Sequence, residues 1–116
     1  MRHIEDTLQK TCVSWFSLQC PKYAKLLHHS PNGGKRNATE AAKFKAMGVR
    51  AGFPDLGLYI ARHGYHGLFI ELKTAKGRQT DKQKYYQAML EEQGYLYEVV
   101  RSLEEFRNII NKYMSL

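Results

Sequence analysis

The chain has 116 residues, 43% of them hydrophobic, and a net charge of +7. This length and apolar content fit one folded domain, residues 1–116, and exclude a disordered chain. The positive charge favours a polyanionic partner, nucleic acid before an acidic membrane. No apolar run approaches the roughly 20 residues needed to span a bilayer. The N-terminus has no apolar signal core, so we expect neither a membrane protein nor a secreted one.

The N-terminal stretch has the apolar spacing of an amphipathic helix. Apolar residues recur every three or four positions and predict a helix over residues 3–19: Ile4, Leu8, Cys12, Trp15 and Phe16. Pro21 cannot continue a helix, so this helix should end before it. Residues 23–29 are expected to form a short strand.

A polar loop and a second helix follow. The segment SPNGGKRN, residues 30–37, is rich in Pro, Gly and Asn, which favours a loop over any regular element. Asn37 can cap a helix over residues 38–47, and Glu40 stands at the capping-box position three residues later. Gly48 should end this helix.

The centre of the chain has the pattern of a β-hairpin. Residues 56–61 and 67–73 are rich in apolar and aromatic side chains. The sequence RHGYH between them, residues 62–66, is typical of a turn. We therefore expect two antiparallel strands that pair about Gly64.

Two helices flank a further strand in the last third of the chain, at residues 81–94, 95–100 and 103–114. Thr80 and Gln83 have the spacing of a capping box for the first helix, and Ser102 and Glu105 have it for the second. The order of elements predicts an α/β fold: a mixed sheet with a central antiparallel hairpin, flanked by helices.

Opposite charges stand near the end of the second hairpin strand, in the sequence GLFIELK. Side chains two apart on a strand share a face, so Glu71 and Lys73 should point the same way and Leu72 the opposite way. Pairing about Gly64 puts Asp55 opposite Lys73 and diagonal to Glu71, with backbones roughly 7–8 Å apart. Two carboxylates at that separation can bind one ion between them.

Two acids and a lysine on one face suit metal-assisted cleavage of a phosphodiester. Mg²⁺ binds carboxylate oxygens and keeps several waters. It acidifies a bound water and neutralises charge on a phosphoryl oxygen. A neighbouring lysine can hold the attacking water and offset developing negative charge. The alternative is a solvated Glu-x-Lys pair at a strand end, which Glu71 and Lys73 alone do not exclude.

These motifs resemble a family of nucleases. PD before one strand (54–55) and ELK on the next (71–73) resemble the PD-(D/E)xK nuclease superfamily. The segments SPNGGKRN, AAKFKAMGVRAGFPDLGLY and GLFIELKTAKGRQTDKQKYYQAMLEEQGY resemble the virus-type replication-repair nuclease (VRR-NUC) domain. The resemblance runs from Glu5 to about Val100. It implies a PD-(D/E)xK restriction-endonuclease-like core.

The resemblance also implies a role for each residue of the site. Asp55 and Glu71 would bind Mg²⁺ or Mn²⁺, with the Leu72 carbonyl as a further ligand, and Lys73 would be the catalytic lysine. Glu5, on the first helix, matches the family's N-terminal acid near the metal, which acts directly or through water. A carboxylate in a first helical turn also complements the helix dipole, which is the alternative for Glu5.

A substrate and an assembly follow from the same resemblance. The family is similar to Holliday-junction resolvases, so we expect a metal-dependent, structure-specific DNA endonuclease that acts on branched or four-way-junction DNA. Stand-alone members of this size resemble homodimers of phage or bacterial type, which implies a cytoplasmic enzyme at the nucleoid of a bacterial or phage-infected cell. The alternatives are a flap or single-strand nuclease and a non-catalytic DNA-binding module with the same fold.

Basic, polar and glycine-rich positions are expected to contact DNA: Asn32, Gly33, Gly34, Lys35, Arg36, Arg50, Lys76, Arg78 and Gln83. Glycines let backbone N–H groups approach a phosphate, and the first of these loops precedes a helix N-terminus, which attracts anions. An ordinary solvated turn is the alternative for this loop. Gln83 has two competing roles, the cap to Thr80 and a polar contact toward the active site. The spacing of the histidines predicts no zinc site.

Overall fold

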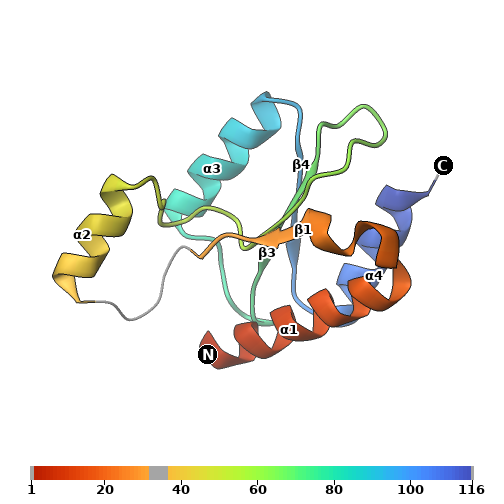
Figure 1. Cartoon of the computed structure of the whole chain (residues 1–116), viewed down its shortest axis with the longest axis horizontal. Coiled ribbons are helices and arrows are strands. Elements are labelled where there is room, and N and C mark those ends of the chain that lie inside the picture. The colour runs from red at the N-terminus through yellow and green to blue at the C-terminus, as the bar shows by residue number, and fades with distance from the viewer. Residues whose placement is uncertain (1, 32–36, 116) are drawn as a thin grey trace.

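The computed structural model describes residues 2–31 and 37–115 as an α/β fold (Figure 1). The elements follow one another as α1 (Arg2–Gln19), the 3₁₀ helix η1 (Pro21–Leu26), β1 (Leu27–His29), α2 (Ala38–Ala46), β2 (Leu56–Leu58), β3 (Leu68–Leu72), α3 (Asp81–Glu92), β4 (Leu96–Val100) and α4 (Leu103–Met114). The predicted fold class is confirmed. Within these described ranges, no helix combines the length and the apolar character needed to cross a membrane.

Strands β2 and β3 lie at the centre of a four-stranded sheet of order β1-β2-β3-β4. β1 pairs with β2, and β2 with β3, in antiparallel ladders, whereas β3 and β4 are parallel. The predicted mixed sheet with a central antiparallel hairpin is therefore confirmed. Helix α3 makes the crossover between β3 and β4, because parallel neighbours cannot be joined by a tight turn.

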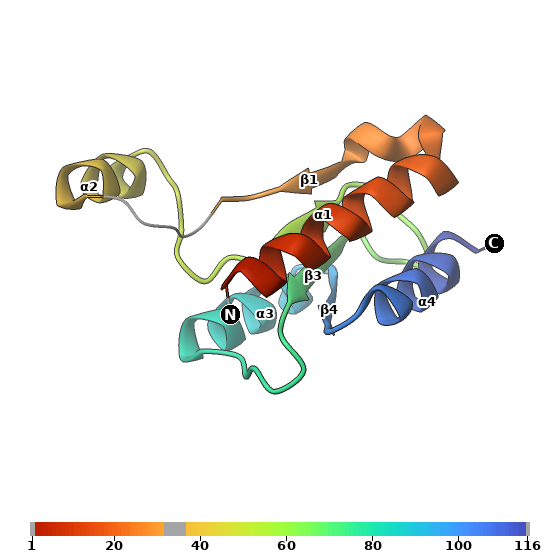
Figure 2. The same ribbon diagram turned by 90° about the horizontal axis from the view of Figure 1, so that it is seen from below.

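Helices α1 and α4 cover one face of the sheet (Figure 2). The even-numbered residues of β2, β3 and β4 point to this face, as the alternation of side chains along a strand requires, and so does Leu27 of β1, which pairs with Leu58. They are buried with side chains of both helices in one apolar core, which includes Cys12, Phe16, Leu56, Leu58, Leu68, Ile70, Leu72, Val100, Phe106 and Ile110. The burial of this apolar surface is the main stabilising contribution to the fold.

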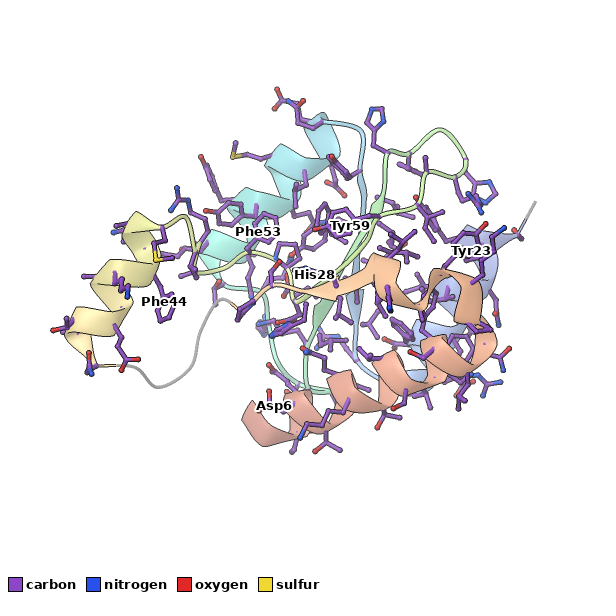
Figure 3. All side chains as sticks on the ribbon, viewed as in Figure 1. Asp6, Tyr23, His28, Phe44, Phe53 and Tyr59 are labelled. Atoms are coloured by element: carbon purple, nitrogen blue, oxygen red, sulfur yellow. The ribbon has the colours of Figure 1, made fainter. Side chains whose placement is uncertain are left out.

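Helix α3 covers the opposite face, where aromatic rings fill the space between helix and sheet. The ring centroid of Phe53 lies 5.5 Å from that of Phe69 on β3 and 5.4 Å from that of Tyr86 on α3. Tyr59 and Tyr95 also contact Phe69 edge to face. Figure 3 shows Phe53 and Tyr59 on the α3 side of the strands. The odd-numbered residues of β3 that follow Phe69 share this face.

The segment between α1 and β1 differs from the prediction. The strand expected over residues 23–29 is wrong in its first half, because residues 21–26 form η1 and only Leu27–His29 is strand. Pro21 stands at the start of η1, where its fixed φ suits a helical turn. No residue of η1 is fully buried, and Tyr23 is partly buried against the core.

The first arm of the hairpin has one more residue than the second between the turn and the paired strands. His63 and Gly64 have positive φ angles of 54° and 85°, which is typical of a two-residue hairpin turn. Arg62 and Tyr65 form a bridge at the turn, and Leu58 and Leu68 form the nearest pair of the ladder. Three residues, 59–61, lie between them on the first arm, and two, 66–67, on the second. The extra residue is a β-bulge, and a bulge shifts the pairing of everything beyond it.

The position of the turn and the extra residue together shift the predicted register by two residues. The ladder pairs Leu56 with Ile70, so the next position puts Asp55 across from Glu71 and not across from Lys73. The prediction had placed the turn symmetrically about one glycine and had no bulge. The predicted and observed registers differ by two residues, and a shift by an even number leaves each side chain on the same face of the sheet. Asp55 and Glu71 therefore share a face, as predicted.

Helix α2 stands apart from the sheet and from the other helices (Figures 1 and 2). Asn37 caps it as predicted, since its side chain accepts a hydrogen bond from Glu40 N–H at 2.8 Å. None of its residues is buried. Helix α2 is therefore an arm that contributes little to the core and presents its side chains to a partner or to solvent.

Candidate active site

Glu71 is a buried carboxylate near the end of β3, with 0% of its surface exposed. Its Oε1 accepts a hydrogen bond from the Tyr97 hydroxyl and another from Gln79 Nε2, the latter at 3.2 Å. Its Oε2 has no hydrogen-bond donor among the described residues. A buried charged oxygen without a hydrogen bond is unfavourable. Oε2 is therefore the atom at which a ligand would be stabilised most.

Lys73 lies on the same face as Glu71, as the sequence predicted, and is 9% exposed. Its Nζ is 3.7 Å from Glu71 Oε2, which makes an ion pair without a hydrogen bond. Its backbone N–H donates to Val100 O on β4 at 2.9 Å. The ammonium is thus held beside the carboxylate at one end of the sheet.

Asp55 precedes β2 and directs its carboxylate across to β3. Its Oδ2 accepts a hydrogen bond from the Leu72 N–H at 2.7 Å. Burial raises the pKa of Asp55, and the charges of Glu71 and Glu5 raise that pKa further, against the lowering effect of the Leu72 hydrogen bond. The charges of Glu71 and Glu5 therefore both act on Asp55 at this end of the sheet.

The Leu72 carbonyl and Glu5 border the same place. The N–H and C=O of one strand residue point to the same side of the strand. The Leu72 N–H is directed at Asp55, so the Leu72 carbonyl faces that side as well. Glu5 is half-buried on α1, whose N-terminal end lies near the end of β3 (Figures 1 and 2). The fold therefore brings the predicted metal ligands to one end of the sheet.

The donor set fits an open site for Mg²⁺ or Mn²⁺. Across residues 4–31 and 37–115, no three His, Cys, Asp or Glu side chains converge closely enough to enclose a metal ion. Mg²⁺ needs no such enclosure, because it keeps several waters and binds through one or two carboxylates. A cation between Asp55 and Glu71 would contact Oε2, which has no hydrogen bond among the described residues. It would also relieve the carboxylate repulsion that, after burial, raises the pKa of Asp55. The residues present therefore fit a divalent ion.

Five of the residues predicted to contact DNA fall outside the described residues: Asn32, Gly33, Gly34, Lys35 and Arg36. Lys76 and Arg78 are exposed in the loop that follows β3. Arg50 is exposed beyond α2, where its Nη1 donates to Lys45 O at 3.0 Å. DNA contact by all of these residues stays a prediction.

Gln83 takes the capping role of the two that were predicted. The Thr80 N–H donates to Gln83 Oε1 at 2.8 Å, and the Gln83 N–H donates to Thr80 Oγ1 at 3.2 Å, which completes the capping box of α3. The polar contact to Glu71 comes from Gln79, in the loop before the helix. A contact of Gln83 with DNA stays a prediction.

Two residues that touch Glu71 were missed by the sequence. Tyr97 is one of them, since its hydroxyl donates to Glu71. The parallel pairing of β3 and β4 places Tyr97 beside Phe69, on the same face as Glu71. The pairing of two strands cannot be predicted from the sequence of either strand alone. Gln79 lies in a loop without regular spacing, so no periodicity marked it.

Two further residues support the site from outside. Arg101 donates from Nη1 to the carbonyls of Thr74, at 2.7 Å, and Gly77, at 2.6 Å, and so fixes the loop that carries Lys76. His29 on β1 brings Nδ1 within 2.8 Å of the Asp55 carbonyl. A carbonyl only accepts hydrogen bonds, so Nδ1 carries the proton in this contact.

Comparison with known proteins gives one family. The family model of the VRR-NUC domain matches residues 2–104 of the chain. A solved structure described as a VRR_NUC domain protein is similar to it with a TM-score of 0.83 and 38% sequence identity. That match covers 95% of this chain and 87% of the other. None of the curated proteins matches.

Proposed function

The chain belongs to the VRR-NUC domain family, and from this premise we propose that it is a structure-specific endonuclease that hydrolyses phosphodiester bonds in branched DNA, such as a four-way junction. The family is one of nucleases that have DNA as partner and generally depend on a divalent metal. The junction preference, the use of Mg²⁺ or Mn²⁺ and the residue roles below are our proposals. So is the assignment of residues 1–116 to a single nuclease domain.

One observation carries the proposal: a buried carboxylate oxygen without a donor lies beside a lysine and near a second acid. Glu71 Oε2 has no hydrogen bond within the described part of the chain, and Lys73 Nζ is 3.7 Å away. Asp55 is held against β3 by the Leu72 N–H. Buried oxygens without a hydrogen bond are rare in folded proteins, so this one supports a ligand site.

Each residue has a proposed role in cleavage. Glu71 and Asp55 would hold the ion together with the Leu72 carbonyl, and Glu5 would assist directly or through a water. A bound divalent ion acidifies water and neutralises charge on the phosphoryl oxygens. The Lys73 ammonium would orient the attacking water toward the phosphorus and stabilise the negative charge that develops on the phosphate.

Positive charge on two separate parts of the molecule supports a branched substrate. Lys76 and Arg78 stand in the loop directly after the strand of Glu71 and Lys73. Arg50 follows the projecting α2 arm (Figure 1). Cations that are spaced apart in this way can contact the phosphates of two duplex arms, and the binding should weaken steeply with salt.

We propose a homodimer as the working assembly. Two-fold symmetry would place two copies of the site against the two strands of a junction, so that both strands are nicked symmetrically. Light scattering should give a mass near twice that of the chain. A monomer that still cuts both strands in one binding event would contradict this proposal.

A substrate panel tests the function. Labelled four-way junction, flap, duplex and single-stranded DNA are incubated with Mg²⁺, with Mn²⁺ or with EDTA. Cleavage of the junction in metal, and none in EDTA, is the expected result. A preference for flaps or single strands would favour that alternative, and binding without cleavage in any metal would favour a non-catalytic module. Glu71→Gln is the control, because it retains the shape of the side chain and should lose cleavage.

A further inference from the structure

We propose that Tyr97 and Gln79 are positioning residues, which hold the Glu71 carboxylate in the orientation that leaves Oε2 open to a divalent ion. Both act through Glu71 Oε1, and neither touches the ion or the DNA. The inference rests on the proposed function, because it assigns the two residues to the metal site of that nuclease.

The Tyr97 hydroxyl reaches Glu71 from the neighbouring parallel strand. Tyr97 pairs with Phe69, and Glu71 stands two residues further along on the same face. The Tyr97 side chain is buried. The Tyr97 hydroxyl donates a hydrogen bond to Glu71 Oε1, because an ionised carboxylate only accepts.

Gln79 belongs to a chain of side-chain amides that has one possible direction. Gln87 Nε2 donates to Glu91 Oε2 at 3.2 Å, so Gln87 Oε1 faces Gln79 and accepts from its Nε2 at 2.8 Å. The other hydrogen of Gln79 Nε2 is then directed to Glu71 Oε1. Carboxylates stand at both ends and only accept hydrogen bonds, so the amide donors must point toward them.

Without these donors the Glu71 carboxylate has a competing partner. Lys73 Nζ is 3.7 Å from Oε2, just beyond hydrogen-bonding distance. A small rotation of the carboxylate would let Lys73 donate to it, and that bond would occupy the oxygen that the ion needs. Two donors on Oε1 oppose the rotation. Groups that orient a metal ligand in this way control the affinity for the metal.

The inference is tested by measuring the Kd for Mn²⁺ of the full chain. The electron paramagnetic resonance signal of the free ion reports how much Mn²⁺ is unbound. Tyr97→Phe keeps the ring and removes one donor, so the Kd for Mn²⁺ should rise about 10- to 100-fold. Tyr113→Phe is the matched control, because Tyr113 also donates from a buried hydroxyl, to Ile60 O at 2.6 Å, on the other side of the sheet. The Kd of Tyr113→Phe for Mn²⁺ should equal that of the unmodified protein.

The amide chain should give a graded series. Gln79→Met retains the length of the side chain and removes its donor, so it should raise the Kd for Mn²⁺ less than Tyr97→Phe does. Gln87→Met should raise the Kd least, because Gln87 reaches Glu71 only through Gln79. A Gln87 effect larger than the Gln79 effect would contradict the proposed chain.

Cleavage and structure separate positioning from chemistry. At saturating Mn²⁺, Tyr97→Phe should recover most of the cleavage rate, and a crystal structure of the metal-free variant should show Lys73 Nζ within hydrogen-bonding distance of Glu71. If Tyr97→Phe binds Mn²⁺ as tightly as the unmodified protein and its Glu71 carboxylate has not moved, the inference is wrong. The proposed nuclease function is then unaffected. Failure of the unmodified protein to bind Mn²⁺ overturns both.

Discussion

The two faces of the sheet bury different kinds of side chain, although the same strands supply both. Toward α1 and α4, β3 contributes Leu68, Ile70 and Leu72 to an apolar core. Toward α3, the alternate positions continue from Phe69 to the buried Glu71. The strand is thus held by one set of side chains while the other set is free to be polar. A charged group can be kept out of water because its neighbours in sequence are anchored on the opposite face.

The faces also contribute differently to stability. A buried carboxylate and ammonium lose hydration on folding, and the loss exceeds their attraction unless the geometry is complete. One oxygen of Glu71 has no donor among the described residues, so this pair is not optimised for stability. Large apolar side chains on the other face offset that cost. Mutations on the apolar face should therefore change stability, and mutations on the α3 face should change chemistry.

The largest effect is expected on the apolar face, from Phe106→Ala. Phe106 is 0% exposed, and truncation of a buried phenylalanine lowers the free energy of unfolding by about 3–5 kcal/mol. Urea unfolding followed by circular dichroism measures the loss. Cleavage per folded molecule should stay close to that of the unmodified protein. A cleavage defect without a loss of stability would break the division between the faces.

Lys73→Met should have the next largest effect, on cleavage. The variant keeps the buried stem and removes the ammonium, so junction cleavage should fall by about 10²–10³-fold, the loss typical of one stabilising group. Loss of the cation beside buried Glu71 should lower the unfolding temperature, but the variant should remain folded at the temperature of the cleavage assay. Lys84→Met, an exposed change on α3, controls for the loss of one charge. Unfolding of Lys73→Met in place of a loss of chemistry would assign Lys73 to the structure.

Local signals in the sequence predicted most of the elements that carry these two faces. The caps Asn37, Thr80 and Ser102 each accept the expected hydrogen bond at the start of a helix. The alternation of apolar residues gave the hairpin strands and the shared face of Glu71 and Lys73. These signals depend on neighbours within a few residues, and so a single sequence contains them.

The errors and omissions depend on contacts between distant parts of the chain. The bulge before Gly64 changed the register, and nothing local marks the extra residue. Tyr97 reaches Glu71 across a parallel ladder, and Arg101 reaches Thr74 across the crossover. Such contacts follow from the packing of elements, which the sequence pattern does not specify. The candidate ligands were therefore predictable, and the residues that support them were not.

Asp55→Asn should sharpen the contrast by increasing stability while removing function. Burial, and then the charges of Glu71 and Glu5, raise the pKa of Asp55 above its ordinary 3.8. A carboxyl with a raised folded-state pKa stabilises the fold when protonated, and this contribution is lost as the pH rises from 3.8 through the raised value. Asn keeps an oxygen for the Leu72 N–H and does not ionise. Near neutral pH, the metal-free variant should be more stable by about 1 kcal/mol.

Unfolding in EDTA checks this sign. The variant and the unmodified protein should differ near neutrality and converge below pH 3.8, and Mn²⁺ should stabilise only the unmodified protein. If Asp55→Asn were less stable near neutrality, Asp55 would belong to the structural part of the molecule.

The smallest effect is expected from Arg101→Met, on DNA binding. Arg101 has its guanidinium bound to the carbonyls of Thr74 and Gly77, so its loss should loosen the loop that carries Lys76 and Arg78. Ordering a side chain on binding costs about 0.5–1.5 kcal/mol, so the Kd for junction DNA should rise by about threefold to tenfold. Arg107→Met removes the same charge from α4, beside Trp15, and fluorescence anisotropy should give it an unchanged Kd. An equal effect of both changes would mean that net charge, and not the order of the loop, determines the affinity.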